Sequence, residues 1–254
     1  MPMDAFFSAP LAAQVWFIQM LAYHGFGLWF EWLDRNGGLS RFKTRPVERM
    51  SYAAMLPRVL ANQVFVLLPT MLLLQWAGLA FVGPAHLPLV MWPLSFVGLT
   101  VGHDVVQYLA HRFVLHRPDM MRRLGHALHH STTGSRGISA CYMSYMDFLL
   151  EIVCPYVIPL ALVGGGGSDM LFHSLVVSAG AFGGLYEHSG YDFSLSLRGC
   201  GGLRAVLAKM ISSEAHAAHH ARGNVSFSDG FGSSNICDTL FRTRWDLVSQ
   251  RGVR

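Results

Sequence analysis

The sequence predicts an all-α membrane protein with four or five membrane-embedded helices and a helical cap on the cytoplasmic side. Hydrophobic residues make up 52% of its 254 residues and charged residues only 13%, which is too few charges for an ordinary soluble domain. Long apolar runs alternate with polar segments, and no low-complexity linker or internal repeat separates them. We therefore expect a single integral-membrane catalytic domain over residues 1–254.

The first two spans are predicted at residues 11–33 and 59–81. Both runs exceed the roughly 20 residues that a helix needs to cross about 30 Å of hydrocarbon. Pro69 is expected to kink the second span. The basic loop after the first span contains Arg35, Arg41, Lys43, Arg45 and Arg49.

Three further apolar runs cover residues 87–102, 141–163 and 170–186. The first of them leads directly into a histidine-rich stretch. The other two are predicted to form a hairpin through the glycine turn at residues 164–167. Residues 189–254 are polar and basic, so we expect a cytoplasmic tail that folds against the membrane ends of the helices.

Positive charge is confined to three parts of the chain, which predicts the topology. None of the 19 lysines and arginines occurs within residues 1–34, 59–111 or 137–197. Cytoplasmic loops carry the excess of positive residues, so the amino terminus is expected outside and both histidine-rich segments inside. The net charge of +4 thus indicates membrane orientation, and nucleic-acid binding is not expected.

The amino terminus argues against a cleaved signal peptide, and the cysteines argue against disulfides and a thiolate metal site. No basic residue precedes Arg35, so the first apolar run is expected to stay as a span and not to be cleaved as a signal peptide. The cysteines form no CxxC pair, which argues against a disulfide framework and a thiolate metal site. They are Cys141, Cys154, Cys200 and Cys237.

Histidines gather in two segments. The stretch from His103 to His130 holds six of the 13 histidines and ends in HALHH, and a matching HAAHH begins at His216. Helical residues three and four apart share a face, so each box presents three imidazoles on one side. Neutral imidazole binds iron, zinc, copper and nickel, so the ligand type alone does not select the metal.

The number of candidate ligands predicts two metal ions, because a single ion cannot use nine. The isolated histidines His24, His86 and His173 are instead expected to be packing, interfacial or hydrogen-bonded residues. The nine candidates are His111, His116, His126, His129, His130, His188, His216, His219 and His220.

Residues 102–243 resemble the sterol desaturase and fatty acid hydroxylase superfamily, whose members are membrane-bound non-haem di-iron enzymes. The motifs that carry the resemblance are Asp104 with Tyr108, His111 and Arg112; HALHH; EHSGYD from Glu187; HAAHHARGN, which ends at Asn224; and CDTLFRT. The segments ACYMSYMDFLLE and EHSGYD are also similar to the cholesterol 25-hydroxylase branch.

The resemblance implies two iron ions that activate dioxygen and oxidise an unactivated C–H bond of a sterol or fatty acyl chain. Zinc could replace iron in purified protein. The chain has no GxGxxG fingerprint and no cysteine cluster, so electrons are expected from a cytochrome b5-like or ferredoxin-like partner. The region from Arg198 to Arg222 is either the docking patch for this partner or a solvated or lipid-facing surface.

The first histidine box departs from the family pattern. The family usually has three residues between its histidines, whereas His111 and His116 enclose four. Five residues turn an ideal helix about 140° off register, so both can bind metal only if the helix ends, bulges or unwinds, which Pro118 favours. His103 is the alternative ligand, although we expect it beside the ligands or unliganded.

Carboxylates near the boxes have two interpretations. They are either solvated or capping groups, or acceptors that orient the distal N–H of a ligand histidine. We favour the second role for Asp104 and Glu187, and Asn224 is a further candidate for such support. Glu214 and Asp238 are the other carboxylates, and Arg112 either pairs with an acid or faces lipid headgroups.

Three other activities compete with lipid hydroxylation. Desaturation and oxidative demethylation use the same chemistry with different substrate placement. A metal transporter would hold its ions near the bilayer midplane, whereas these histidines crowd one surface. A hydrolytic zinc enzyme would need a carboxylate base beside the ligands, and the sequence indicates none there.

Overall fold

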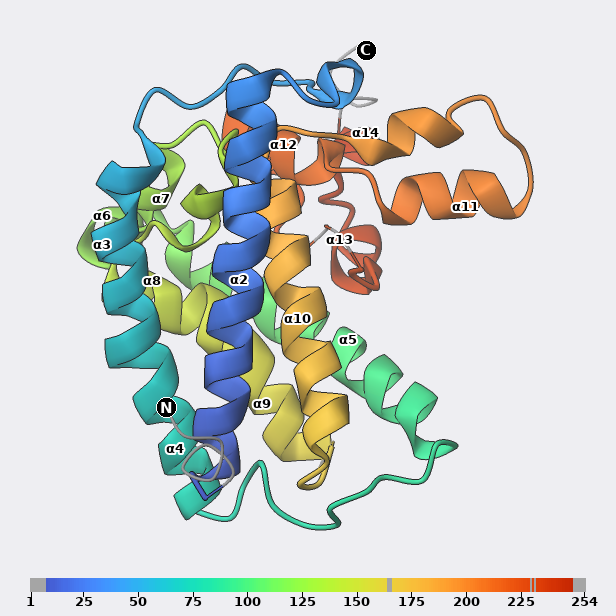
Figure 1. Ribbon diagram of the computed structural model, residues 1–254. Coiled ribbons are helices and arrows are strands. Elements are labelled where there is room, and N and C mark those ends of the chain that lie inside the picture. Colours follow the sequence, from blue (N-terminus) through green and yellow to red (C-terminus); the bar gives the residue numbers. More distant parts are fainter. Residues whose placement is uncertain (1–7, 164–165, 229, 231, 249–254) are drawn as a thin grey trace.

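The protein is an upright bundle of helices with a polar cap at one end (Figure 1). The computed structural model describes residues 8–163, 166–228, 230 and 232–248. Within these ranges no strand occurs, in agreement with the predicted all-α class. Half of the predicted glycine turn, residues 164–165, lies outside the described residues, as does the end of the predicted tail.

The central pair of helices is α2 (Leu11–Asn36) and α10 (Met170–Glu187), which pack along each other (Figure 1). α2 ends at Gly37, whose left-handed conformation lets its N–H donate to the Leu33 carbonyl. α10 begins at Asp169, whose carboxylate accepts the N–H of Phe172. Both helices fall on predicted apolar runs.

A second long helix is assembled from α3 (Tyr52–Asn62), a π turn η2 (Gln63–Leu67) and α4 (Leu68–Trp76). It begins at the capping residue Ser51 and not at the predicted residue 59, because capping chemistry and not hydropathy sets the start. The π turn lies directly before Pro69, at the place of the predicted kink.

The histidine-rich stretch is delivered by α5 (Met91–Ala110), which continues past the predicted end at residue 102 into a π turn, η3 (His111–Leu115). α5 packs against α9 (Cys154–Val163). The helix that ends in α9 starts with α8 (Tyr145–Phe148) and a third π turn, η5 (Leu149–Val153).

All five predicted apolar runs are largely helical. Two helices of the described chain are long and apolar enough to cross a membrane, Tyr52–Trp76 and Tyr145–Leu162. The others carry more polar residues, such as Glu31 in α2 and Asp104 in α5.

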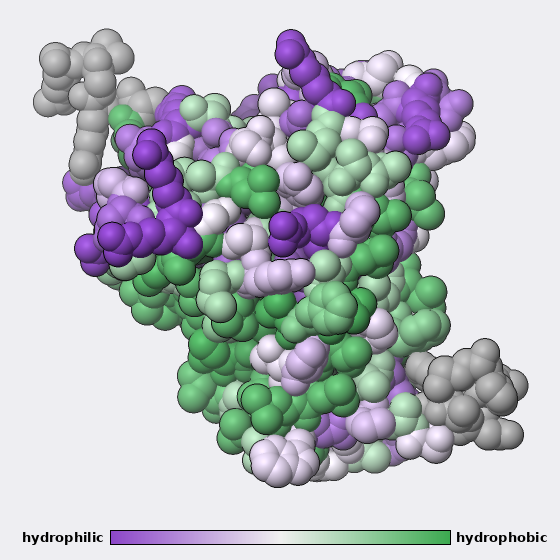
Figure 2. Space-filling model, turned by 90° about the vertical axis from the view of Figure 1, so that its left-hand side faces the viewer, coloured by the Kyte–Doolittle hydropathy of each residue, from purple (hydrophilic) through white to green (hydrophobic). Residues whose placement is uncertain are grey.

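The polar segments collect at one end of the bundle. The basic loop after α2 lies there together with α7 (His126–His130) and α12 (Glu214–Arg222), while the loop that precedes α5 lies at the other end (Figure 1). Figure 2 shows hydrophilic residues gathered on this end above a band of hydrophobic ones. Both histidine boxes thus lie at the end that carries the basic loop, as the charge pattern predicts.

The tail forms short helices over this polar end. α13 (Ile236–Leu240) contacts α5, α12 contacts α14 (Trp245–Val248), and α11 (Leu203–Met210) projects away from the bundle as an arm (Figure 1). The remaining elements are η1 (Ser40–Phe42), α6 (Pro118–Arg123), η4 (Gly137–Cys141) and η6 (Phe193–Leu197).

Candidate metal centre

A π turn places His111 and His116 beside each other. The His116 N–H donates to the His111 carbonyl at 2.9 Å, which is the five-residue hydrogen bond of a π turn. The two ring centroids are 4.8 Å apart. The extra residue in this box is therefore absorbed by the bulge that the sequence requires, and Pro118 starts the next helix immediately afterwards.

Six of the remaining seven histidines come from two short helices that have a glycine at one end. α7 follows Gly125, which has a φ of 75° and whose hypothetical Cβ would lie 2.6 Å from Ser144 Cβ. α12 ends at Gly223, whose N–H donates to the His219 carbonyl at 2.7 Å. His188 caps the carboxyl end of α10.

The nine histidines form two compact groups. Neighbouring Nε2 atoms are 3.0–3.2 Å apart in the first group and 2.8–3.3 Å apart in the second. We call them the five-histidine group, which consists of His111, His116, His126, His130 and His219, and the four-histidine group, which consists of His129, His188, His216 and His220.

These separations fit metal ions. Two nitrogens about 2.1 Å from one ion are about 3.0 Å apart at a right angle and about 3.4 Å apart at the tetrahedral angle. Facing lone pairs repel one another unless a proton or a cation lies between them. The donor set thus suits two ions that accept imidazole, one for each group.

Several rings are fixed through the nitrogen that faces away from the group. Nδ1 of His126 donates to Asp147 Oδ1 at 2.8 Å. Such a bond leaves the Nε2 lone pair for a metal and holds the ring in place. In three other rings Nδ1 donates to a backbone carbonyl: Phe227 for His111 (2.7 Å), Val225 for His219 (2.7 Å) and Gly184 for His188 (2.9 Å).

Burial keeps these imidazoles neutral. Loss of water on burial is the larger cause and repulsion by neighbouring imidazoles the smaller one. Together they lower the pKa of His130 to about 2 and that of His116 to about 3. Burial likewise lowers the pKa of His219 to about 3. Metals bind the neutral form, so these rings are ready to bind at neutral pH without losing a proton.

Two carboxylates that the sequence interpretation overlooked complete the centre. Asp147 and Glu151 lie within reach of His126 Nδ1, at 2.8 and 3.4 Å. They are the only acids in the apolar run at residues 141–163 and stand four residues apart, on one helix face. An ionisable residue inside such a run indicates function, and this pattern could have identified them.

Glu187 and His103 lie near the centre but outside both histidine groups. Glu187 Oε2 is 4.0 Å from His216 Nδ1, in the direction expected for a supporting carboxylate. His103 lines a cavity beside the groups and belongs to neither of them. The π turn supplies His116 to the five-histidine group in its place.

Asp104 contacts the tail and not a histidine, which differs from the expectation. It accepts hydrogen bonds from Ser228 Oγ and the Ile236 N–H, each at 2.7 Å. Asp238 accepts the N–H of the same Ser228 at 2.6 Å. Because the preceding residue, Phe227, is the carbonyl acceptor for His111, these two acids fix the segment that orients a ligand ring.

The other candidates have separate places. Asn224 is exposed in the turn after α12, and Glu214 pairs with Arg198. Arg112 donates to the Tyr108 hydroxyl and lies over aromatic rings.

The isolated histidines lie apart from the centre. His24 bonds to Gln63 at 2.9 Å and His173 to the Gly167 carbonyl at 3.1 Å, as predicted for packing residues. His86 is exposed.

An apolar cavity of about 450 Å³ leads to the histidines. Leu67, Met71 and Phe96 line its apolar part, and His111, His188 and Glu151 line its polar end.

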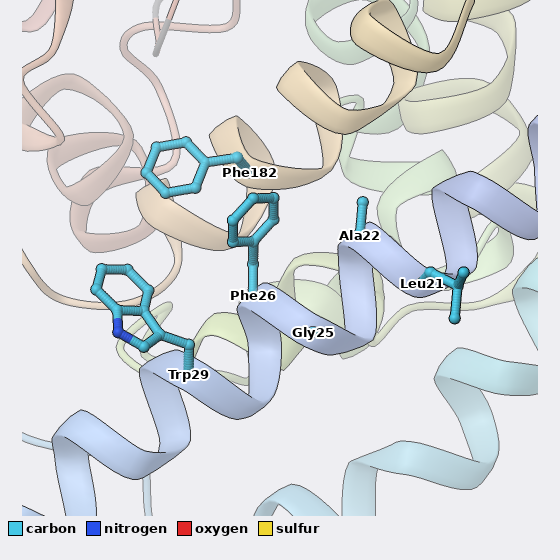
Figure 3. A pocket seen from close by; sticks show the side chains of 6 residues that line it. All are labelled: Leu21, Ala22, Gly25, Phe26, Trp29 and Phe182. Atoms are coloured by element: carbon cyan, nitrogen blue, oxygen red, sulfur yellow. The ribbon is translucent and has the colours of Figure 1, made fainter. Parts of the chain in front are cut away.

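A second hollow, of about 530 Å³, is a shallow depression on the outer face of α2 and α10. Figure 3 shows its lining of apolar side chains such as Phe26, Trp29 and Phe182. No histidine lines it. The cavity that ends at the histidine groups is therefore the candidate substrate site.

The fold and the site define a helical, membrane-associated protein whose clustered histidines could hold metal ions. Residues 96–243 match the family described as fatty acid hydroxylase, and they include both histidine groups, Asp147 and Glu151. The chain belongs to this family, which is part of the sterol desaturase/fatty acid hydroxylase superfamily. Membership indicates an oxidoreductase of the lipid hydroxylase or desaturase type. No curated protein and no solved structure matches the chain significantly.

Proposed function

We propose that the protein is a membrane-bound di-iron oxygenase that hydroxylates an unactivated C–H bond of a lipid, either a sterol or a fatty acyl chain. The observation that carries this proposal is the position of the two histidine groups at the polar end of an apolar cavity. Family membership supplies the reaction class.

The five-histidine group would hold one iron and the four-histidine group the other. Bound iron supplies the activation of dioxygen and the oxidising power of the reaction, and zinc could occupy the same donors in purified protein. The surrounding chain keeps the rings oriented: Asp147 holds His126, and the segment anchored by Asp104 and Asp238 holds His111 through the Phe227 carbonyl.

The cavity would bind the substrate and keep water away. Its apolar walls favour a hydrocarbon chain or ring system, because burial of apolar surface drives binding. The exclusion of water protects the oxidising centre from side reactions. The depth to which the lipid enters the cavity would then determine which C–H bond lies next to the metal centre.

Desaturation and oxidative demethylation are the second candidate outcomes within the same site. They begin with removal of hydrogen from the same kind of C–H bond; desaturation then removes a second hydrogen from the neighbouring carbon, and demethylation oxidises one methyl carbon repeatedly until it leaves. Both are consistent with the family.

A zinc hydrolase and a metal transporter belong to other classes. The sequence indicated no carboxylate base beside the candidate ligands, but Glu151 does lie beside them. Family membership now argues against a hydrolase, together with nine histidines where a catalytic zinc uses three protein ligands. The position of the histidines at one end of the bundle argues against a transporter.

We further propose that α2, α5 and α10 are embedded in the membrane beside the two candidate spans, with the metal centre on the cytoplasmic side. Electrons would come from a docked carrier protein of the cytochrome b5 or ferredoxin kind. Within the predicted basic patch, Arg198 is engaged by Glu214 and Asp192, so Arg204 and Lys209 on the projecting α11 and the exposed Arg222 of α12 are the cations for such docking.

The decisive experiment compares the lipids of cells that express the protein with those of cells that express the His129→Ala variant. Cells are grown under ¹⁸O₂, and lipids are surveyed by mass spectrometry without preselection. The wild type is expected to add one labelled oxygen to a lipid, or to remove two hydrogens if it is a desaturase. His129→Ala should yield neither product, because it removes a ligand of the four-histidine group.

Release of a fatty acid or headgroup without label would instead identify a hydrolase. An unchanged lipid profile, in cells that also hold a suitable reductant, would contradict the proposal. Metal analysis of the purified wild type should find two ions per chain, and one or none would likewise contradict it.

A further inference from the structure

We propose that the Glu151 carboxylate is a tenth metal ligand, shared by the two ions on the side of the substrate cavity. This inference rests on the proposed function in one respect, namely that the two histidine groups each hold an ion. It adds a carboxylate to a centre that the histidine motifs alone describe as all-nitrogen.

The position of one oxygen atom is the first support. Glu151 Oε1 is 3.7 Å from Nε2 of His111, in the five-histidine group, and 3.9 Å from Nε2 of His129, in the four-histidine group. Two atoms bound about 2.1 Å from one ion can be at most about 4.2 Å apart. The same oxygen therefore lies near one nitrogen of each group, and Glu151 also forms a third candidate metal-binding set with His126 and Asp147.

The second support is that Glu151, which lies against Asp147, orients no histidine ring through a hydrogen bond. Asp147 already orients His126, with Oδ1 at 2.8 Å from Nδ1, whereas Glu151 Oε2 is 3.4 Å from the same atom. Within the described part of the chain, Oε2 is buried and makes no hydrogen bond, and the whole residue is only 4% exposed. A buried carboxylate without a donor is costly unless it is protonated or faces a cation, and Oε1 is the oxygen of this carboxylate that faces the two histidine groups.

Charge balance is the third support. Nine neutral imidazoles contribute no charge, so two divalent ions would bring a charge of about +4 into a largely buried site. Water cannot screen such charge well, and a carboxylate in direct contact offsets it. Asp147 is used by His126, which leaves Glu151 as the acid that can reach both ions.

The local backbone fits this task. Glu151 is the middle residue of the π turn η5 (Leu149–Val153), in which the Cys154 N–H donates to Leu149 O. π turns occur frequently at functional sites. Glu151 also lines the cavity together with His111 and His188, so the shared oxygen would face the substrate side of the centre.

The test uses manganese in the full-length protein purified in detergent. Two Mn²⁺ ions that share a ligand are magnetically coupled, whereas separate ions give the six-line spectrum of isolated Mn²⁺ in electron paramagnetic resonance. The variants are Glu151→Gln, which removes the charge with little change of shape, and Asp119→Asn as the control, which neutralises an exposed carboxylate on α6 outside the histidine groups. Bound metal is counted in every sample.

Wild type and Asp119→Asn are expected to hold two coupled ions. Glu151→Gln should lose the coupling and weaken the binding of at least one ion by about 10- to 100-fold, the range reported for groups that support metal sites. Two uncoupled ions in the wild type, or unchanged coupling in Glu151→Gln, would overturn this inference and leave the two-metal proposal intact. Fewer than two ions in the wild type would overturn both.

A second measurement covers the case in which Glu151→Gln does not fold. In a crystal structure of the zinc-loaded wild type, a Glu151 oxygen is expected within about 2.3 Å of each ion. If one of the two ions has no Glu151 oxygen within about 3 Å, Glu151 is not shared.

Discussion

Each candidate metal-binding imidazole is distinguished by the surroundings of its two nitrogens. The Nε2 atoms converge within the two groups, while Nδ1 atoms such as that of His126 donate outwards to acceptors in the surrounding structure. His24 and His173 also have hydrogen-bond partners, but their partners are a glutamine and a lone carbonyl far from other histidines. A candidate ligand therefore differs from a packing histidine in that its Nε2 atom lies next to the Nε2 atoms of other histidines.

His116 and His103 provide a prediction at this scale. His116→Ala should remove at least one metal ion, because His116 belongs to the five-histidine group. His103→Ala should keep both ions and change only the KM for the lipid, because His103 lines the cavity. Metal content per chain and steady-state kinetics of the two variants check this, and a loss of metal only in His103→Ala would reverse the assignment.

π turns are the recurring device among the helices. Three occur in the described chain, and two of them present functional candidates, the His111–His116 pair and Glu151. A π turn carries one residue more per turn than an α-helix turn, so it changes which side chains share a face. The first histidine box tolerates its extra residue for this reason.

Changes in the length of this box test the role of the turn. Deletion of Val114 leaves the two histidines four residues apart, and an ordinary α-helix turn then aligns them about as well as the π turn does. The deletion variant should keep both metal ions. Insertion of one alanine after Val114 should lose metal from the five-histidine group, because no regular turn aligns residues six apart.

Metal analysis of the two variants, with the helix content followed by circular dichroism, checks this prediction. Loss of metal from the deletion variant with helix content intact would show that the π turn has a further role beyond alignment.

The whole molecule separates a polar end, with the histidines and the basic loop, from an opposite end without lysine or arginine (Figure 1). Cysteines introduced at exposed positions, Ser40→Cys after α2 and Ala85→Cys before α5, should therefore react from opposite sides of a membrane. In intact cells a membrane-impermeant maleimide is expected to label Ala85→Cys only. Both variants are made in a protein whose four native cysteines have been replaced. Labelling of Ser40→Cys alone would show the orientation opposite to the proposed one.

The pH dependence of stability is a second property of the whole molecule. Burial lowers the pKa values of His116, His130 and His219 in the folded, metal-free protein, whereas unfolding restores values near 6.5. Below about pH 6.5 the unfolded chain thus binds more protons, so stability falls as the pH decreases from there towards the folded pKa values. Each such histidine adds a slope of up to about 1.4 kcal/mol per pH unit.

Thermal unfolding of chelator-treated protein at pH 7.5, 6.5 and 5.5 measures this effect. The melting temperature should drop between pH 6.5 and 5.5, and His130→Gln should make the drop smaller. A melting temperature that does not change over this range would contradict the assignment of neutral, buried imidazoles.

The sequence by itself determined the helical class, the positions of the five apolar runs and the nine histidines that the structure brings together. It could do so because hydropathy, helical periodicity and residue type are local properties, and histidine spacing within one turn needs no tertiary contact. The distribution of lysine and arginine predicted that both boxes lie at one end, since each apolar helix reverses the direction of the chain.

Only the tertiary structure decided how the nine histidines divide into groups of five and four, because His129 joins His188 from a different helix and leaves its neighbours His126 and His130. It also decided that Asp104 holds the tail and that Asp147 and Glu151 face the histidines. The physical reason is that a carboxylate's role depends on which donor comes within about 3–4 Å of it, and here the donors come from segments far apart in the chain.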